Sequence, residues 1–139
     1  MPSPGLQRLR DLQLFRPPNG MWANLGMRLV EMEEGNVVVE AHFSSAMHGA
    51  RGGIHRGAIA ALADGALACA AATLVETGQV ATTVELLVDF FTPAAPGVAT
   101  ARGRVLHRQG HLVYCETVIE QGDYKLADGH STIALITPS

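Results

Sequence analysis

The chain has few cysteines, few aromatic residues and no concentration of positive charge. Its 139 residues include two cysteines, and aromatic residues make up 5% of the total. Cys69 and Cys115 stand apart in apolar stretches rather than in a Cys-x-x-Cys pair. We therefore expect two buried, reduced thiols and a reducing, cytoplasmic location. The net charge of −3, without a long basic run, indicates neither a nucleic acid nor a membrane partner.

Signals for export, metal binding and covalent catalysis are also missing. The N-terminal residues contain no apolar core of the kind found in signal peptides, so we expect no export. None of the six histidines forms a tight pair of metal ligands such as His-Glu-x-x-His, and no Gly-x-Ser-x-Gly turn is present. Neither cysteine stands in a polar, electropositive stretch. We therefore expect no metal, no resident cofactor, and neither a serine nor a cysteine nucleophile.

The chain length fits one domain, which we expect to span residues 1–139, with residues 1–20 as an N-terminal extension. Helical spacing of apolar residues predicts a short helix over residues 6–15. Two strand-like runs, residues 23–32 and 37–43, flank a Glu-Glu-Gly-Asn turn and predict a hairpin. A loop is predicted at residues 44–55. Short loops favour antiparallel pairing of four further predicted strands: residues 80–91, 98–106, 112–120 and 125–136.

Residues 57–75 are dominated by alanine and predict a helix, in which Asp64 and Thr73 are the only polar side chains. Because this helix is apolar on all sides, we expect it to be buried. A membrane span is disfavoured, since alanine and glycine are weakly lipophilic and Asp64 lies near the middle. The pattern predicts an α+β fold in which one antiparallel sheet curls around the helix and a second copy covers its other side.

Asp64 and the segment before it are the candidates for chemistry. Burying a lone carboxylate costs several kcal/mol unless it is paired or hydrogen-bonded. Asp64 therefore lies on one exposed stripe of the helix, has a structural hydrogen-bond partner, or faces a cleft where a carboxylate is needed. Residues 51–57 place glycines, His55 and Arg56 at the N-terminus of the predicted helix. Such a terminus can hold an anion or a developing oxyanion, although the same glycines also suit a plain turn.

Residues 53–64, Gly-Ile-His-Arg-Gly-Ala-Ile-Ala-Ala-Leu-Ala-Asp, resemble hotdog-fold thioesterases of the phenylacetate-pathway (PaaI-like) type, within the 4-hydroxybenzoyl-CoA thioesterase superfamily. In that family His-Gly-Gly opens the central helix, and an Asp follows at the spacing seen here from His55 to Asp64. Residues 82–94 resemble the family's third strand and its closing Pro-Ala. The resemblance implies a hotdog fold, a long antiparallel β-sheet wrapped around one buried central α-helix.

The resemblance also implies an acyl-CoA thioesterase that works without a metal or a covalent intermediate. The backbone N–H of Arg56, which precedes Gly57 in the His-Gly-Gly position, would polarise the thioester carbonyl. Asp64 of the facing subunit would activate or position the attacking water, or attack directly. Thr83 matches a Ser/Thr position that helps to hold this water, and His55 would fix the loop and the thioester. These roles agree with the chemistry of a helix N-terminus and a carboxylate.

Two positions depart from the family's pattern. Arg56 replaces the first glycine after the histidine, and Gly49 stands where many members carry an Asn, with His48 as a candidate substitute. The resemblance implies contacts with coenzyme A near the turn at Gly110. The candidates for the coenzyme A phosphates are Arg56, Arg104, Arg108 and His111, and the alternative for each arginine is a solvated surface charge.

The family implies a homo-oligomer, with the dimer as the smallest active unit and tetramers common. Coenzyme A would enter only as part of the substrate, and the sequence does not define the acyl group. Two alternatives stay open, because one fold hosts many functions. One is a hotdog dehydratase or hydratase that acts on acyl chains carried by coenzyme A or acyl carrier protein. The other is a non-catalytic acyl-CoA-binding module.

Overall fold

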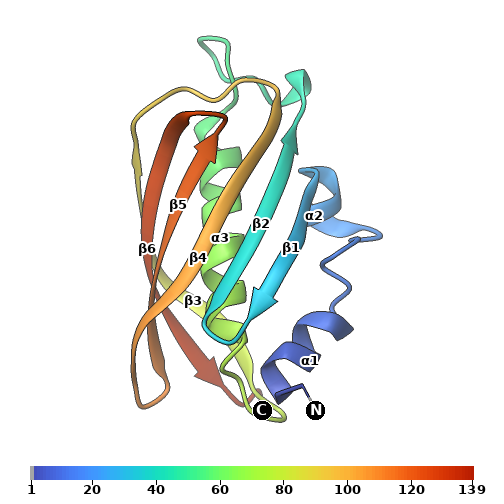
Figure 1. Ribbon diagram of the computed structural model, residues 1–139, viewed down its shortest axis with the longest axis vertical. Helices are drawn as coiled ribbons and strands as arrows, with labels where there is room; N and C mark the ends of the chain where they lie inside the picture. The colour runs from blue at the N-terminus through green and yellow to red at the C-terminus, as the bar shows by residue number, and fades with distance from the viewer. Residues whose placement is uncertain (1) are drawn as a thin grey trace.

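A computed structural model of the protein describes residues 2–139 and shows a six-stranded antiparallel sheet curved around one helix, α3 (Arg56–Ala72) (Figure 1). The strands are β1 (Met27–Glu33), β2 (Asn36–Phe43), β3 (Val80–Phe90), β4 (Gly97–Gln109), β5 (Leu112–Gln121) and β6 (Tyr124–Ile136). Their order across the sheet is β1-β2-β4-β5-β6-β3, and every neighbouring pair is antiparallel. The predicted α+β architecture, a sheet wrapped around one apolar helix, is confirmed.

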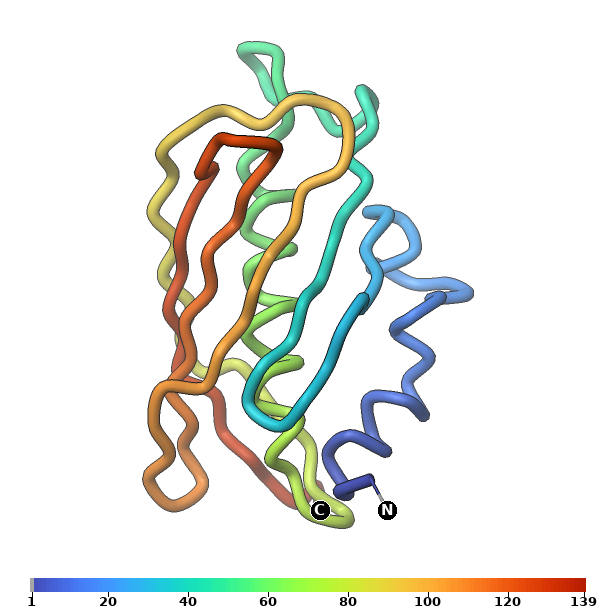
Figure 2. The backbone as a smooth tube through the Cα atoms, in the orientation of Figure 1, coloured from blue at the N-terminus to red at the C-terminus, as the bar shows by residue number. Residues whose placement is uncertain are grey.

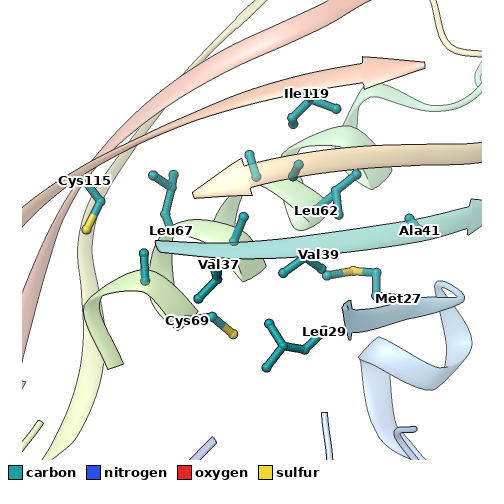
Figure 3. Packing of buried hydrophobic residues seen from close by; sticks show 14 of the residues in the cluster. Met27, Leu29, Val37, Val39, Ala41, Leu62, Leu67, Cys69, Cys115 and Ile119 are labelled. Carbon is teal, nitrogen blue, oxygen red and sulfur yellow. The ribbon is translucent and has the colours of Figure 1, made fainter. Parts of the chain in front are cut away.

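The core lies between α3 and the inner face of the sheet, where alternate strand residues point toward the helix. Leu29 of β1 and Val39 of β2 meet Leu62 and Leu67 of α3, and all four side chains are fully buried (Figure 3). The helix approaches β4 closely at Gly103, where an added Cβ would lie 2.4 Å from the carbonyl oxygen of Ala66. Alanine and glycine are therefore needed here because they let the helix and sheet backbones come together.

The two ends of α3 are held by side chains. His55 is the N-cap residue, and its Nδ1 atom accepts a hydrogen bond from the Gly57 N–H at 2.8 Å. At the other end, the Thr73 hydroxyl donates to the Ala70 carbonyl at 2.7 Å and accepts from the Gly35 N–H, in the β1–β2 turn, at 2.8 Å. Within residues 2–139 no helix combines the length and apolar character needed to span a membrane.

The N-terminal extension forms two helices, α1 (Pro4–Asp11) and α2 (Gly20–Asn24), on the β1 side of α3 (Figure 1). The predicted helix over residues 6–15 corresponds to α1, which ends earlier. The prediction of a strand from residue 23 is wrong, because residues 23–26 belong to α2 and the turn after it. Trp22 packs against Gly65 of α3, and Gly26 turns the chain into β1 with φ +63°, so tertiary packing overrides the local strand pattern.

The loop before α3 lies at one end of the sheet, and the β4–β5 turn and the chain termini lie toward the other end (Figure 2). The loop before α3 contains a short 3₁₀ helix, Ser45–Met47, and a single β-bridge between His48 and Ile54. This loop lies at the end of the molecule opposite the β4–β5 turn, while both chain termini lie near that turn's end (Figure 2). The predicted loop and the four predicted C-terminal strands are confirmed.

Candidate active site

The carboxylate of Asp64 is held by β3. Asp64 is half-buried at the middle of α3, and Thr83 of β3 donates a hydrogen bond from Oγ1 to Asp64 Oδ1 at 2.8 Å. Asp64 forms no ion pair within residues 2–139. An ionised carboxyl group has several acceptor sites, so the Thr83 hydroxyl orients the group while leaving it able to accept a proton from a bound water.

The N-terminus of α3 supplies a second polar group. Because His55 Nδ1 accepts the Gly57 N–H, the neutral imidazole carries its proton on Nε2, which can then donate to a ligand. The Arg56 N–H has no acceptor among residues 2–139. An unpaired N–H at the positive end of a 17-residue helix is suited to an oxyanion.

A groove of about 780 Å³ lies beside this helix terminus. Its walls come from the glycine-rich loop, residues 49–56, and from the end of β3 and the segment after it, residues 90–93. The Arg56 guanidinium carbon lies 5.4 Å from the centre of the Phe90 ring, within the range of a cation–π contact. Arg51 also lines the groove, so two positive charges face it beside aromatic rings.

Within one chain, Asp64 and the helix N-terminus lie too far apart to act on the same carbonyl group. Eight residues of α-helix separate Arg56 from Asp64, which corresponds to about 12 Å along the axis. The structure therefore brings Asp64 together with Thr83, and His55 with Arg56 and Gly57, as two separate groups.

Besides Arg56, the residues predicted to contact coenzyme A lie in three places. His48 forms the β-bridge with Ile54, beside the loop. Arg104 lies on the outer face of the sheet, away from α3, and is paired with Glu116. The β4–β5 turn carries Arg108, Gly110 and His111, and Arg108 Nε donates to the Gly110 carbonyl at 2.9 Å. In one chain this turn lies at the opposite end of the molecule from the N-terminus of α3 (Figure 1).

The sequence analysis did not single out Arg51, Phe90 or Phe91 as site residues. Arg51 had one usable signal, since it begins the same glycine-rich segment as His55. Phe90 ends β3 and Phe91 follows it, and only the fold places these two residues beside the loop. Phe91 is 57% exposed and lies under Lys125, whose Nζ is 5.0 Å from the ring centre.

The two thiols are buried, as predicted. Burial raises the pKa of Cys69 to about 12, with a further contribution from the nearby Asp64 carboxylate, and burial raises the pKa of Cys115 to about 12. Both groups are therefore neutral near pH 7 and poor nucleophiles. No three His, Cys, Asp or Glu side chains in the described part of the chain are grouped as they would be around a metal ion.

Comparisons with solved structures identify the fold. The Escherichia coli PaaI protein, from the phenylacetic acid degradation operon, superposes with a TM-score of 0.84 at 23% identity, covering 96% of this chain and 94% of that chain. A thioesterase family protein from Silicibacter pomeroyi gives a TM-score of 0.84 at 24% identity, covering 96% of this chain and 99% of that chain. The predicted hotdog fold is confirmed.

Sequence comparisons agree with this fold. A predicted esterase of Saccharolobus solfataricus is 26% identical over 114 residues, which are 82% of this chain and 81% of that protein. The sequence profile of the Thioesterase superfamily matches residues 51–127, more than half of the chain. The matched segment contains His55, Asp64 and Thr83, the residues around which both polar groups are built. The chain therefore belongs to the thioesterase superfamily.

Proposed function

We propose that the protein hydrolyses acyl-CoA thioesters, with Asp64 as the general base. The strongest support is the 2.8 Å hydrogen bond from Thr83 to Asp64, which orients a half-buried carboxylate on a helix that is otherwise apolar beyond Arg56. A carboxylate kept in such a position without a cationic partner is suited to removing a proton from water. Membership of the thioesterase superfamily supports a thioester as the substrate that this water attacks.

The reaction needs one water and no other reactant. Asp64 takes a proton from the water as its oxygen forms a bond to the thioester carbonyl carbon, and negative charge develops on the carbonyl oxygen. The carbon–sulfur bond then breaks, and the sulfur takes the proton back from Asp64. The products are a carboxylic acid and the free thiol of coenzyme A.

The Arg56 N–H of a second copy stabilises the developing oxyanion in this proposal. The separation of about 12 Å along α3 prevents Asp64 and Arg56 of one chain from sharing a carbonyl group. Preorganised N–H donors aimed at an oxyanion are among the largest contributions to acyl transfer. The Nε2–H of His55 in the second copy provides another donor beside the same carbonyl.

The edge of the sheet provides the surface on which the second copy binds. β3 is an edge strand of 11 residues, and Val84 and Leu87 on it are 63% and 57% exposed. An edge of this length with exposed apolar side chains favours pairing with another strand. Antiparallel pairing of two β3 strands brings the end of one, with Phe90 and Arg56, to the start of the other, with Thr83. The two halves of the site meet there.

The same pairing gives coenzyme A a path along the dimer. Arg51 and Arg56 of one chain would contact its phosphates in the groove of about 780 Å³. At the other chain, Thr82 of β3 pairs with Ala134 of β6, which pairs with Leu112 beside the β4–β5 turn. Arg108, Gly110 and His111 of that turn therefore approach the partner's groove, although they lie far from it within one chain.

Free-thiol release from a panel of short-chain, long-chain and aryl acyl-CoAs tests this function. We expect Asp64→Asn to lower kcat by about two orders of magnitude or more, since general base catalysis supplies roughly that factor. Asp123→Asn, an exposed change in the β5–β6 turn, is the matched control and should retain the rate of the unmodified protein.

Absence of thiol release from every thioester, by protein shown to be folded and oligomeric, would contradict the proposal. Hydration of an unsaturated acyl-CoA with the thioester intact would instead indicate a hydratase. Binding without any turnover would indicate an acyl-CoA-binding module.

A further inference from the structure

The N-terminal helices form one wall of a second, apolar groove that contains Asp64. This groove has a volume of about 350 Å³ and runs between α1, α2 and the face of α3 that carries Gly65 and Ala68. Its other wall residues include Leu12 and Trp22, and apart from Asp64 and the exposed Arg8 every lining side chain is uncharged at neutral pH. Figure 1 shows α1 and α2 along the β1 side of α3.

We propose that this groove binds the acyl chain of the thioester and selects a linear, medium-length chain of roughly ten bonds. This length matches the distance along α3, calculated from the helical rise per residue. The inference rests on the proposed function, since Asp64 marks the position of the reacting carbonyl. An acyl chain attached to that carbonyl has a continuous apolar path along α3, away from the groove assigned to coenzyme A.

The length follows from the geometry of α3. The groove follows α3 from Ala61 to Ala72, and the part that leads away from Asp64 to Ala72 spans eight residues, or about 12 Å along the helix axis. An extended chain of single bonds advances about 1.2 Å per bond, because a fully extended residue spans about 3.6 Å over three bonds. About ten bonds therefore fill the part of the groove between Asp64 and Ala72. A compact ring fills it poorly, since a cavity of about 150 Å³ is already large enough for benzene.

The width of the groove is set by small residues and by Trp22. Ala61 and Ala68 on α3 are half-buried and leave room above the helix. At Gly65 an added Cβ would lie 3.1 Å from Cζ2 of Trp22 and 2.7 Å from Cε of Met27. The indole ring is therefore seated directly on the helix beside Asp64, where a bound chain would touch it.

Trp22 is the single tryptophan of the chain, so its fluorescence reports on this groove alone. The experiment uses full-length Asp64→Asn protein, titrated with decanoyl-CoA, acetyl-CoA and free coenzyme A. We expect decanoyl-CoA to shift the tryptophan emission in a saturable way, and the other two ligands to leave it unchanged. Unchanged emission while calorimetry detects decanoyl-CoA binding would overturn the inference. This is also the result expected if the partner copy fills the groove.

Chain-length profiles of kcat/KM provide the second test. In the unmodified protein we expect the profile to peak near decanoyl-CoA. Ala68→Leu should lower the ratio of decanoyl-CoA to butyryl-CoA kcat/KM by about tenfold or more, since each methylene accommodated or excluded changes discrimination by about tenfold. Leu12→Phe, on the more exposed wall, should shift the ratio in the same direction if Ala68→Leu does not fold.

Ala60→Leu is the matched control, because Ala60 is on α3 and half-buried but does not line the groove. It should leave the ratio unchanged. A flat chain-length profile with hydrolysis that depends on Asp64 would overturn the inference and leave the proposed function standing. Absence of hydrolysis by the unmodified protein, together with a Trp22 response to decanoyl-CoA, would contradict the proposed function and support the groove as an acyl-chain site.

Discussion

At the scale of single residues, Asp64 of α3 and Thr73, the C-cap residue of this helix, each have a partner from a distant part of the chain. Thr73 joins the Ala70 carbonyl to the Gly35 N–H and is 1% exposed. Asp64 accepts from Thr83. The two side chains differ in how much of their hydrogen-bonding capacity remains unused. Both hydrogen-bonding roles of the Thr73 hydroxyl are used, which indicates a structural residue, whereas the Asp64 carboxylate keeps unused acceptor sites.

The Thr83 hydroxyl is expected to act through Asp64 as a positioning residue. Thr83→Val keeps the shape of the side chain and removes a hydrogen bond to a charged group, which contributes about 1.5–3 kcal/mol. We therefore expect kcat to fall by roughly 10- to 100-fold, with KM little changed. Thr83→Ser should restore most of the rate. Equal losses in both variants would assign Thr83 a packing role only.

The buried thiols make stability depend on pH in the alkaline range. The pKa values of Cys69 and Cys115 rise from 9.0 to about 12 on folding, so the folded state keeps protons that the unfolded state loses. Their contribution is complete below pH 9 and is lost as the pH rises toward 12. We expect urea unfolding to show the free energy of unfolding falling by up to about 1.4 kcal/mol per pH unit for each thiol.

A Cys115→Ala variant isolates this effect from other groups that titrate at high pH. Below pH 9 its free energy of unfolding should be lower because a buried side chain is truncated. Between pH 9 and 12, however, it should fall less steeply than that of the unmodified protein. Parallel curves for the two proteins would show that Cys115 is not responsible for the slope.

At the scale of secondary structure elements, glycine determines how closely helices approach their neighbours. Gly103 of β4 faces the Ala66 carbonyl of α3, and Gly5 of α1 faces the Thr73 carbonyl at the end of α3. An added Cβ at Gly5 would lie 2.2 Å from that oxygen. These contacts fix the central helix in the curve of the sheet and hold the N-terminal extension against its C-terminal end.

Gly103→Ala is expected to destabilise the protein by about 1–3 kcal/mol, the range typical of overpacked cores. The obstacle is a backbone oxygen at 2.4 Å, so no side-chain rotation relieves it. Gly49→Ala is the control, since its Cβ would have nothing nearer than 3.6 Å and its φ is not in the left-handed region. Chemical denaturation of both variants measures the difference. Equal stability would mean that α3 shifts without cost.

At the scale of the whole molecule, the proposed reaction requires a second copy of the chain. Asp64 and the N-terminus of α3 belong to one helix but cannot act on one carbonyl group, and β3 presents a long unpaired edge with apolar side chains. Both observations have the same solution, a second copy paired along β3. Activity and oligomerisation are then expected to be lost together.

Val84→Lys tests this coupling. A lysine on an edge strand opposes strand pairing. We expect sedimentation to show a particle of one chain, 14.7 kDa, and thiol release to fall to background while circular dichroism is retained. Leu106→Lys, a similar change at a side chain that is 46% exposed on β4, should stay oligomeric and active. An active monomer would refute a site shared between chains.

The sequence by itself determined the elements of this protein. Alanine content defined the central helix, strand-like stretches between short loops defined the strands from residue 80 onward, and the spacing from His55 to Asp64 indicated the family. These features depend on neighbours in sequence, which is why periodicity and motif spacing reveal them. The same reasoning failed at residues 23–26, where Trp22 gains contact with α3 and a helix forms in place of a strand.

Only the tertiary structure decided which residues meet. The Thr83–Asp64 hydrogen bond, the groove around Arg51 and Phe90, and the position of β3 at the edge all join segments far apart in the chain. Local patterns carry no record of such contacts, because strand order and helix placement follow from burying the whole apolar surface at once. The sequence thus identified the carboxylate proposed to be catalytic. The fold determined its orientation, the groove beside it and the edge strand along which a second copy is proposed to pair.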